Sequence, residues 1–222
     1  MTYDEMYREL TEDFMELRAW MSHRWKDIRR RSLKARTFPF VVRHTHITSS
    51  HNEWTYNVSV FKKLRAGERA CSMTYTRLRT DDGDYYMMVH PVTDSVLHVC
   101  AYLPHFFKRY AKRMGLNLSG HELADHYFMH NDKGVRIAQP DTQYDLCLCM
   151  EEGIAMGKLL NDRMIIYKTF IRYDMSIGWQ KEAFRLAKER INHDILMVDR
   201  VPVETEITER YIERDKTKKF IF

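Results

Sequence analysis

The side chains of this chain with the clearest chemical potential lie in residues 103–116, LPHFFKRYAKRMGL. A proline near the start of this segment and a glycine near its end are typical of helix boundaries, so the segment predicts a helix. On that helix His105, Arg109 and Arg113 follow one another at steps of four residues and share a face. A side chain that titrates near neutral pH is therefore predicted to stand in line with two permanent cations.

This combination of side chains suits phosphodiester cleavage. The reaction needs a group that moves a proton near neutral pH and guanidinium groups that stabilise charge on the phosphate. We therefore predict His105, Arg109 and Arg113 as catalytic residues of an RNA-directed enzyme that needs no metal. Lys108 and Lys112 enlarge the cationic surface and are predicted to bind nucleic acid. An ordinary charged helix face without a ligand is the alternative interpretation.

A second cationic run lies at residues 22–37, where seven bases stand against one acid. Arg29, Arg30 and Arg31 form its centre, and we predict that they bind RNA or another polyanion. Trp25 interrupts the run, but it falls on an apolar stripe and is predicted to belong to the core. This run favours a second interpretation of the protein, a non-catalytic interaction protein with a basic face.

The histidines suggest a third interpretation, a metal-dependent hydrolase. Alternation along a strand puts His44 and His46 on one face, as in many metal sites. Helical spacing similarly brings Glu122, His126 and His130 together. The sequence shows no third ligand near the first pair, and polar solvated faces explain both groups, so we expect no metal and no other cofactor.

Composition sets the class of protein. Of the 222 residues, 44% are hydrophobic and 30% are charged, with a net charge of +5, which is typical of a globular chain able to bind a polyanion. No apolar run is long enough to span a bilayer, and the N-terminus lacks the basic-then-apolar order of a signal peptide. The four cysteines are too few for a disulfide scaffold. We expect a soluble cytoplasmic protein without a membrane partner.

Hydrophobic periodicity predicts an α+β protein with a mainly antiparallel sheet. Apolar residues three and four apart indicate helices, whereas alternation with a period of two indicates strands. No helix separates the successive strands before Pro104, which favours antiparallel pairing. The predicted elements, all within one domain over residues 1–222, are a long N-terminal helix over 3–35, a β meander over 38–102, two inserted helices over 104–130, β strands over 143–172, and a C-terminal helix over 176–192 followed by a tail.

Local signals refine these elements. Asp82-Gly83 is the clearest hairpin signal in the meander. Ser119 followed by Glu122 has the pattern of a capping box at the start of the second inserted helix. Leu186 is expected on the apolar face of the C-terminal helix.

Residues 95–172 resemble the small toxin-like ribonuclease domains of the barnase, colicin and RelE type. The likeness rests on the order of a strand, a helix with the pattern H-x3-R-x3-R, a second helix, and strands ending in the apolar run IIYKTFI. In that group the catalytic residues are a histidine, basic residues and a hydroxyl on the sheet. The resemblance implies that Thr169 joins the histidine and the two arginines of the helix in catalysis, with RNA as the substrate.

Overall fold

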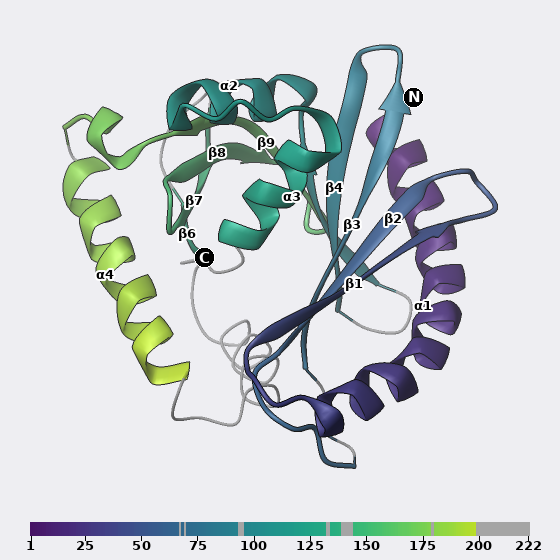
Figure 1. Cartoon of the computed structure of the whole chain (residues 1–222). Coiled ribbons are helices and arrows are strands. Elements are labelled where there is room, and N and C mark those ends of the chain that lie inside the picture. The colour runs from purple at the N-terminus through teal and green to yellow at the C-terminus, as the bar shows by residue number, and fades with distance from the viewer. Residues whose placement is uncertain are drawn as a thin grey trace. The chain divides into compact units, whose positions relative to one another are not determined.

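The computed structural model describes residues 1–66, 68, 70–92, 96–131, 134–138, 144–178 and 180–198, with side chains up to residue 191. The chain forms two compact units, Met1–Cys100 and Ala101–Phe222 (Figure 1). The predicted single domain stays a prediction, and the division between the units falls inside a strand, Leu97–Tyr102. The tail beyond residue 202 lies outside the described residues.

The predicted α+β class is confirmed. Within the described ranges the N-terminal helix is followed by strands, two inserted helices, further strands and a last helix, and the strand pairs with a determined register are antiparallel. The helices are α1 (Tyr3–Lys34), α2 (Pro104–Met114), α3 (Gly120–His130) and α4 (Gln180–Val198), and a short 3-10 turn covers Tyr173–Met175. The strands are β1 (Phe40–Ile47), β2 (Glu53–Val60), β3 (Cys71–Thr80), β4 (Gly83–Pro91), β5 (Leu97–Tyr102), β6 (Gly134–Ala138), β7 (Leu146–Met150), β8 (Ile154–Leu159) and β9 (Met164–Ile171).

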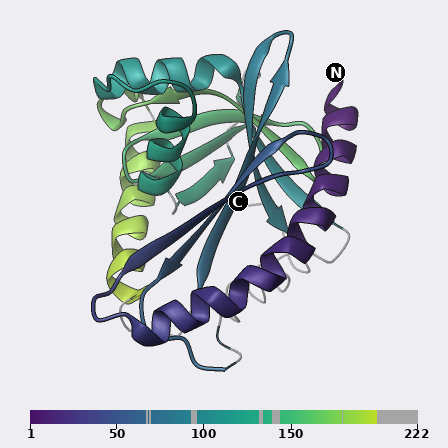
Figure 2. The ribbon, with the colours of Figure 1, turned by 45° about the vertical axis from the view of Figure 1, so that its right-hand side comes forward.

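Helix α1 begins with a complete capping box. The Glu5 backbone N–H donates to the Thr2 hydroxyl at 3.3 Å, and the Thr2 backbone N–H donates to the Glu5 carboxylate at 2.6 Å. These bonds satisfy two donors that a helix start otherwise leaves unpaired. The helix then covers β1 to β4, which lie in this order, and Figure 2 shows α1 following these strands with a gentle curve.

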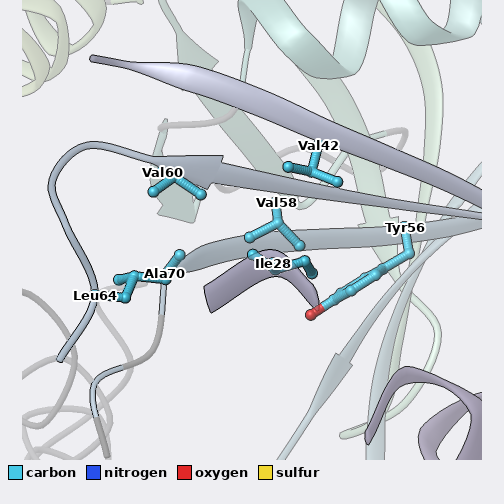
Figure 3. Close-up of a cluster of buried hydrophobic side chains, with 7 residues drawn as sticks. All are labelled: Ile28, Val42, Tyr56, Val58, Val60, Leu64 and Ala70. Carbon is cyan, nitrogen blue, oxygen red and sulfur yellow. The ribbon is translucent and has the colours of Figure 1, made fainter. Parts of the chain in front are cut away.

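The C-terminal half of α1 closes a core at one end of unit 1. Ile28 is fully buried there, and Figure 3 shows it among the side chains of the strands. The Leu64 backbone N–H donates to the Ser32 hydroxyl at 3.1 Å, which ties the β2–β3 connection to the helix. The cluster consists of Ile28, Val42, Tyr56, Val58, Val60, Leu64 and Ala70. Trp25 packs against it, as predicted.

A buried carboxylate fixes the middle of α1 to β2. Asp13 is only 2% exposed, and its Oδ2 accepts hydrogen bonds from Asn52 Nδ2 at 2.8 Å and Trp54 Nε1 at 3.0 Å. Its Oδ1 is buried without a partner among the described residues. Burial of a carboxylate is unfavourable unless hydrogen bonds replace its water, so each of these two donors matters for stability.

Trp54→Phe is therefore expected to lower the free energy of unfolding by about 1–3 kcal/mol, because it removes one donor and leaves the buried Asp13 carboxylate under-satisfied. Urea denaturation measures the change. Adding Asp13→Asn to Trp54→Phe should recover part of the loss, since a neutral amide costs less to bury than a carboxylate. A Trp54→Phe protein as stable as the wild type would contradict this account.

The hairpin predicted at Asp82-Gly83 is present, shifted by one residue. Thr80 pairs with Gly83, so Asp81 and Asp82 are the two residues of the turn. Gly83 follows the turn with a φ of 117°, a conformation that favours glycine.

Unit 2 carries helices on both faces of its strands, which lie in the order β9-β8-β7-β6. The Tyr127 hydroxyl of α3 contacts the Met150 sulfur at 3.2 Å, whereas Cys149, the preceding residue of β7, packs with Phe184 of α4. Successive strand residues point to opposite faces, so α3 and α4 lie on opposite sides. Figure 1 shows β6 to β9 between these two helices.

Aromatic rings hold α2 and α3 to the strands of unit 2. Phe106 of α2 lies 5.0 Å from the Tyr102 ring and 5.2 Å from the Tyr127 ring, both edge-on. Tyr110 lies 4.9 Å from Phe170 of β9. Edge-to-face pairs of this kind add to the stabilisation from burial. The α2 helix is therefore rigidly seated on β9.

Three local expectations need correction. Ser119 does precede α3, but its side chain makes no capping hydrogen bond. The next residue, Gly120, has a left-handed φ of 55°, so the backbone at the helix start does not have the geometry of a capping box. Leu186 is 53% exposed, and Ala187 packs in its place. The strand β6 was missed, because it has only five residues, which are exposed or partly buried.

Candidate functional site

Helix α2 has an apolar face and the cationic face that the sequence predicts. Its apolar side chains Phe106, Phe107 and Tyr110 are buried against the unit 2 core. His105, Lys108, Arg109 and Lys112 are exposed on the remaining surface, and Arg113 is half-buried. The helix holds four cations and no acid, so no carboxylate of its own neutralises this surface.

An irregularity of β9 lies beside this helix. Thr169 pairs with Met156, and the next pair of the ladder joins Tyr167 to Gly157, so Lys168 has no counterpart on β8. The extra residue is a β-bulge, a device that re-aims side chains and is frequent near functional sites. A side chain at Gly157 would put a Cβ 2.6 Å from the Ile166 carbonyl oxygen, so glycine is required there.

Arg113 is held at this bulge. Its Nη1 donates to the Thr169 hydroxyl at 3.3 Å, and Thr169 itself is buried. Burial lowers the pKa of the Arg113 guanidinium, and the nearby positive charge of Arg109 lowers it further. The structure thus brings together two residues that the resemblance assigned to one site. In this structure Thr169 accepts a hydrogen bond from Arg113. Its side chain is buried and does not reach the exposed surface of the helix.

His105 contacts the same bulge through the backbone of Lys168. Burial, followed by the charges of Arg109 and Lys108, lowers the pKa of the imidazole below its ordinary value of 6.5, and the hydrogen bond to the Lys168 backbone opposes this shift only in part. Both effects favour the neutral imidazole, which is the form that can accept a proton.

Arg109 lies between the two anchored side chains and acts electrostatically on both. A phosphate group at this surface would meet guanidinium groups that are always charged beside a neutral imidazole. Such an arrangement can bind an anion and move a proton in its vicinity.

The cations that the sequence predicts on α1 belong to unit 1. Arg31 is exposed, and Arg30 is exposed but pairs with Asp27 at 2.9 Å. Arg29 is half-buried, and its Nε has no hydrogen-bond partner among the described residues. Two of the three predicted RNA contacts therefore face solvent.

The histidines of β1 face α1. His46 stacks on Trp20 at 4.9 Å, and its Nε2 lies 3.0 Å from a Glu16 oxygen. His44 meets the same Trp20 ring edge-on at 5.8 Å. The two histidines share a face, as alternation predicts, and that face packs the helix against the strand. Across the described ranges, no group of three or more His, Cys, Asp or Glu side chains is arranged to hold a metal ion.

Sequence reasoning missed a polar network behind α2. The Tyr110 hydroxyl donates to Glu152 Oε2 at 2.5 Å and lies 2.9 Å from His126 Nδ1. Asn131 Nδ2 donates to the same Glu152 oxygen at 2.7 Å. Tyr110 belongs to the buried apolar face of α2, and no spacing in the sequence links it to Glu152.

Comparison with known proteins adds no assignment: no family, no curated protein and no solved structure matches this chain. In the part of the chain that the structure describes, no helix is long and apolar enough to cross a membrane.

Proposed function

We propose that α2 and the bulge of β9 form an RNA-binding site at which His105 acts as the base in metal-independent phosphodiester cleavage. The observation that carries the proposal is the anchoring of His105 and Arg113 at adjacent residues, Lys168 and Thr169. A proton acceptor and a guanidinium group are thereby tied to one rigid point of the sheet. Catalysis by positioned groups depends on such fixed geometry.

The reaction follows from the groups present. His105 takes the proton of a ribose 2′-hydroxyl, the 2′ oxygen forms a bond to phosphorus, and the bond from phosphorus to the 5′ oxygen breaks. The departing oxygen takes a proton from water, which leaves a 2′,3′-cyclic phosphate and a free 5′-hydroxyl. Arg109 and Arg113 stabilise the charge that develops on the phosphate. Thr169 positions Arg113.

The binding half of the proposal is tested by salt dependence. For single-stranded RNA each phosphate contact contributes about 0.7 to the slope of log affinity against log salt, so the double change Arg109→Ala with Arg113→Ala should reduce that slope by about 1.4. Fluorescence anisotropy with labelled single-stranded RNA measures it. Thermal unfolding checks that the variant is folded.

A matched control is available on α4, which lies on the opposite face of the unit 2 strands. Lys181 and Arg190 are both exposed, so Lys181→Ala with Arg190→Ala removes the same charge from another surface. This control should keep the wild-type slope. If both double variants lost the same amount of slope, RNA binding would depend on the net charge of the protein and not on a specific site at α2.

The exposed cations of α1 favour a second function, non-catalytic binding of a polyanion. Arg29→Ala, Arg30→Ala and Arg31→Ala together test it in the same assay. Loss of binding in this triple variant, with binding retained in the α2 variant, would move the RNA surface to unit 1.

A further inference from the structure

Two of the three histidines of α3 form a pair whose geometry goes beyond the RNA proposal. His126 and His130 stand one helical turn apart, and their rings are stacked with centroids 4.1 Å apart and planes within 17°. His130 is exposed and His126 is half-buried, so the pair is open to solvent.

The tautomer of His126 follows from its neighbour. Tyr110 has a single hydroxyl proton, which it donates to Glu152 Oε2 at 2.5 Å. Towards His126 Nδ1, at 2.9 Å, the phenol oxygen can therefore only accept. The proton of His126 is thus on Nδ1, and Nε2 carries a lone pair.

Glu152, which accepts the Tyr110 proton, is itself held in place by hydrogen bonds. Asn131 Nδ2 donates to Glu152 Oε2 at 2.7 Å, and the Glu152 backbone N–H donates to Asn131 Oδ1 at 3.3 Å. Asn131 is buried. The chain of hydrogen bonds from Asn131 through Glu152 and Tyr110 therefore orients the His126 ring.

His130 has the same tautomer for an independent reason. Its Nδ1 lies 2.8 Å from the backbone carbonyl oxygen of His126. A carbonyl oxygen only accepts, so His130 Nδ1 is protonated and its Nε2 also carries a lone pair. Two imidazoles on successive turns are thus prepared to donate electron pairs through Nε2.

We propose that His126 and His130 bind one divalent transition-metal ion, such as Zn²⁺, through their Nε2 atoms. Imidazole nitrogen suits ions of this class and not Mg²⁺ or Ca²⁺, which prefer oxygen. Histidine ligands of metals almost always donate their other N–H to a carboxylate, carbonyl or similar group, as both of these do. For His126 the accepting group is the Tyr110 hydroxyl.

The site has two protein ligands, because no cluster of three metal-binding side chains occurs among the described residues. Water or a small ligand completes the coordination. Such a site exchanges its ion readily, and it departs from the expectation, made from the sequence, that the protein binds no metal. It does not depend on the RNA site of α2.

Calorimetric titration of Zn²⁺ into the metal-free full-length protein tests the site. His130→Ala, a change at an exposed residue, should weaken binding at least about tenfold, and Tyr110→Phe should weaken it about 10- to 100-fold by releasing the His126 ring. His23→Ala, which removes an exposed histidine of α1, should leave the affinity unchanged. Thermal unfolding identifies any variant that fails to fold.

Nitrogen-15 NMR of the histidine rings gives a second readout that needs no variant. Without metal, both rings should be protonated on Nδ1, and Zn²⁺ should shift Nε2 of both. The proposal is overturned if the rings carry their protons on Nε2, if the wild type does not bind Zn²⁺, or if His130→Ala binds it as tightly as the wild type.

Discussion

His105→Ala is expected to slow RNA cleavage by about 10²- to 10⁴-fold, the usual contribution of a positioned acid or base, while RNA affinity changes little. The variant removes the proton acceptor but keeps Arg109 and Arg113, which supply the phosphate contacts. Labelled single-stranded RNA, incubated without added metal and resolved by length, measures the rate, and the 2′,3′-cyclic phosphate end identifies the reaction.

The pH profile provides an internal check of the same prediction. The folded-state pKa of His105 lies below 6.5, so the base form persists at neutral pH and is lost as the pH falls through that lowered value. Cleavage should therefore decline only on the acidic side of pH 6.5. His23→Ala is the control and should cleave as the wild type does. Equal cleavage by wild type and His105→Ala would assign the activity to another site or to a contaminant.

Phe106→Ala is expected to lower the free energy of unfolding by about 3–5 kcal/mol, the largest stability effect that we predict. Phe106 is fully buried and packs edge-on against the Tyr102 and Tyr127 rings. Truncation leaves a cavity between α2, α3 and the strands, which the rigid rings cannot fill by relaxing. Urea denaturation of the full chain measures the change.

Leu186→Ala is the matched control for this large loss. The side chain is also apolar and helical, but it is 53% exposed, so the change should stay within about 0.5 kcal/mol of the wild type. A comparable loss in both variants would mean that burial does not govern stability in unit 2. A Phe106→Ala protein as stable as wild type would show that α2 is not seated as described.

The type and order of the elements could be predicted from local patterns. The spacing of Met6, Leu10, Phe14 and Leu17 brings apolar side chains to one face only in a helix, and these residues are buried in α1. The alternating run FVVRHTHI coincides with β1. Gly115 ends α2, as its freedom at positive φ predicts, with a φ of 68°.

The candidate site was predictable in the same local sense. Helix geometry alone aligns His105, Arg109 and Arg113, because residues four apart lie on neighbouring turns. Helix geometry does not predict which residues these side chains contact. Arg113 meets Thr169 across 56 residues, and Tyr110 meets Glu152 across 42.

Contacts over such separations depend on how the strands and helices of unit 2 pack, which no local pattern contains. The bulge at Lys168 depends on the register between β8 and β9, and a register belongs to a pair of strands rather than to either sequence. The tautomer of His126 likewise depends on the Tyr110 hydroxyl, which folding brings to it from another helix. Spacing along the chain therefore accounts for which side chains share a face, and tertiary packing accounts for what each of them contacts.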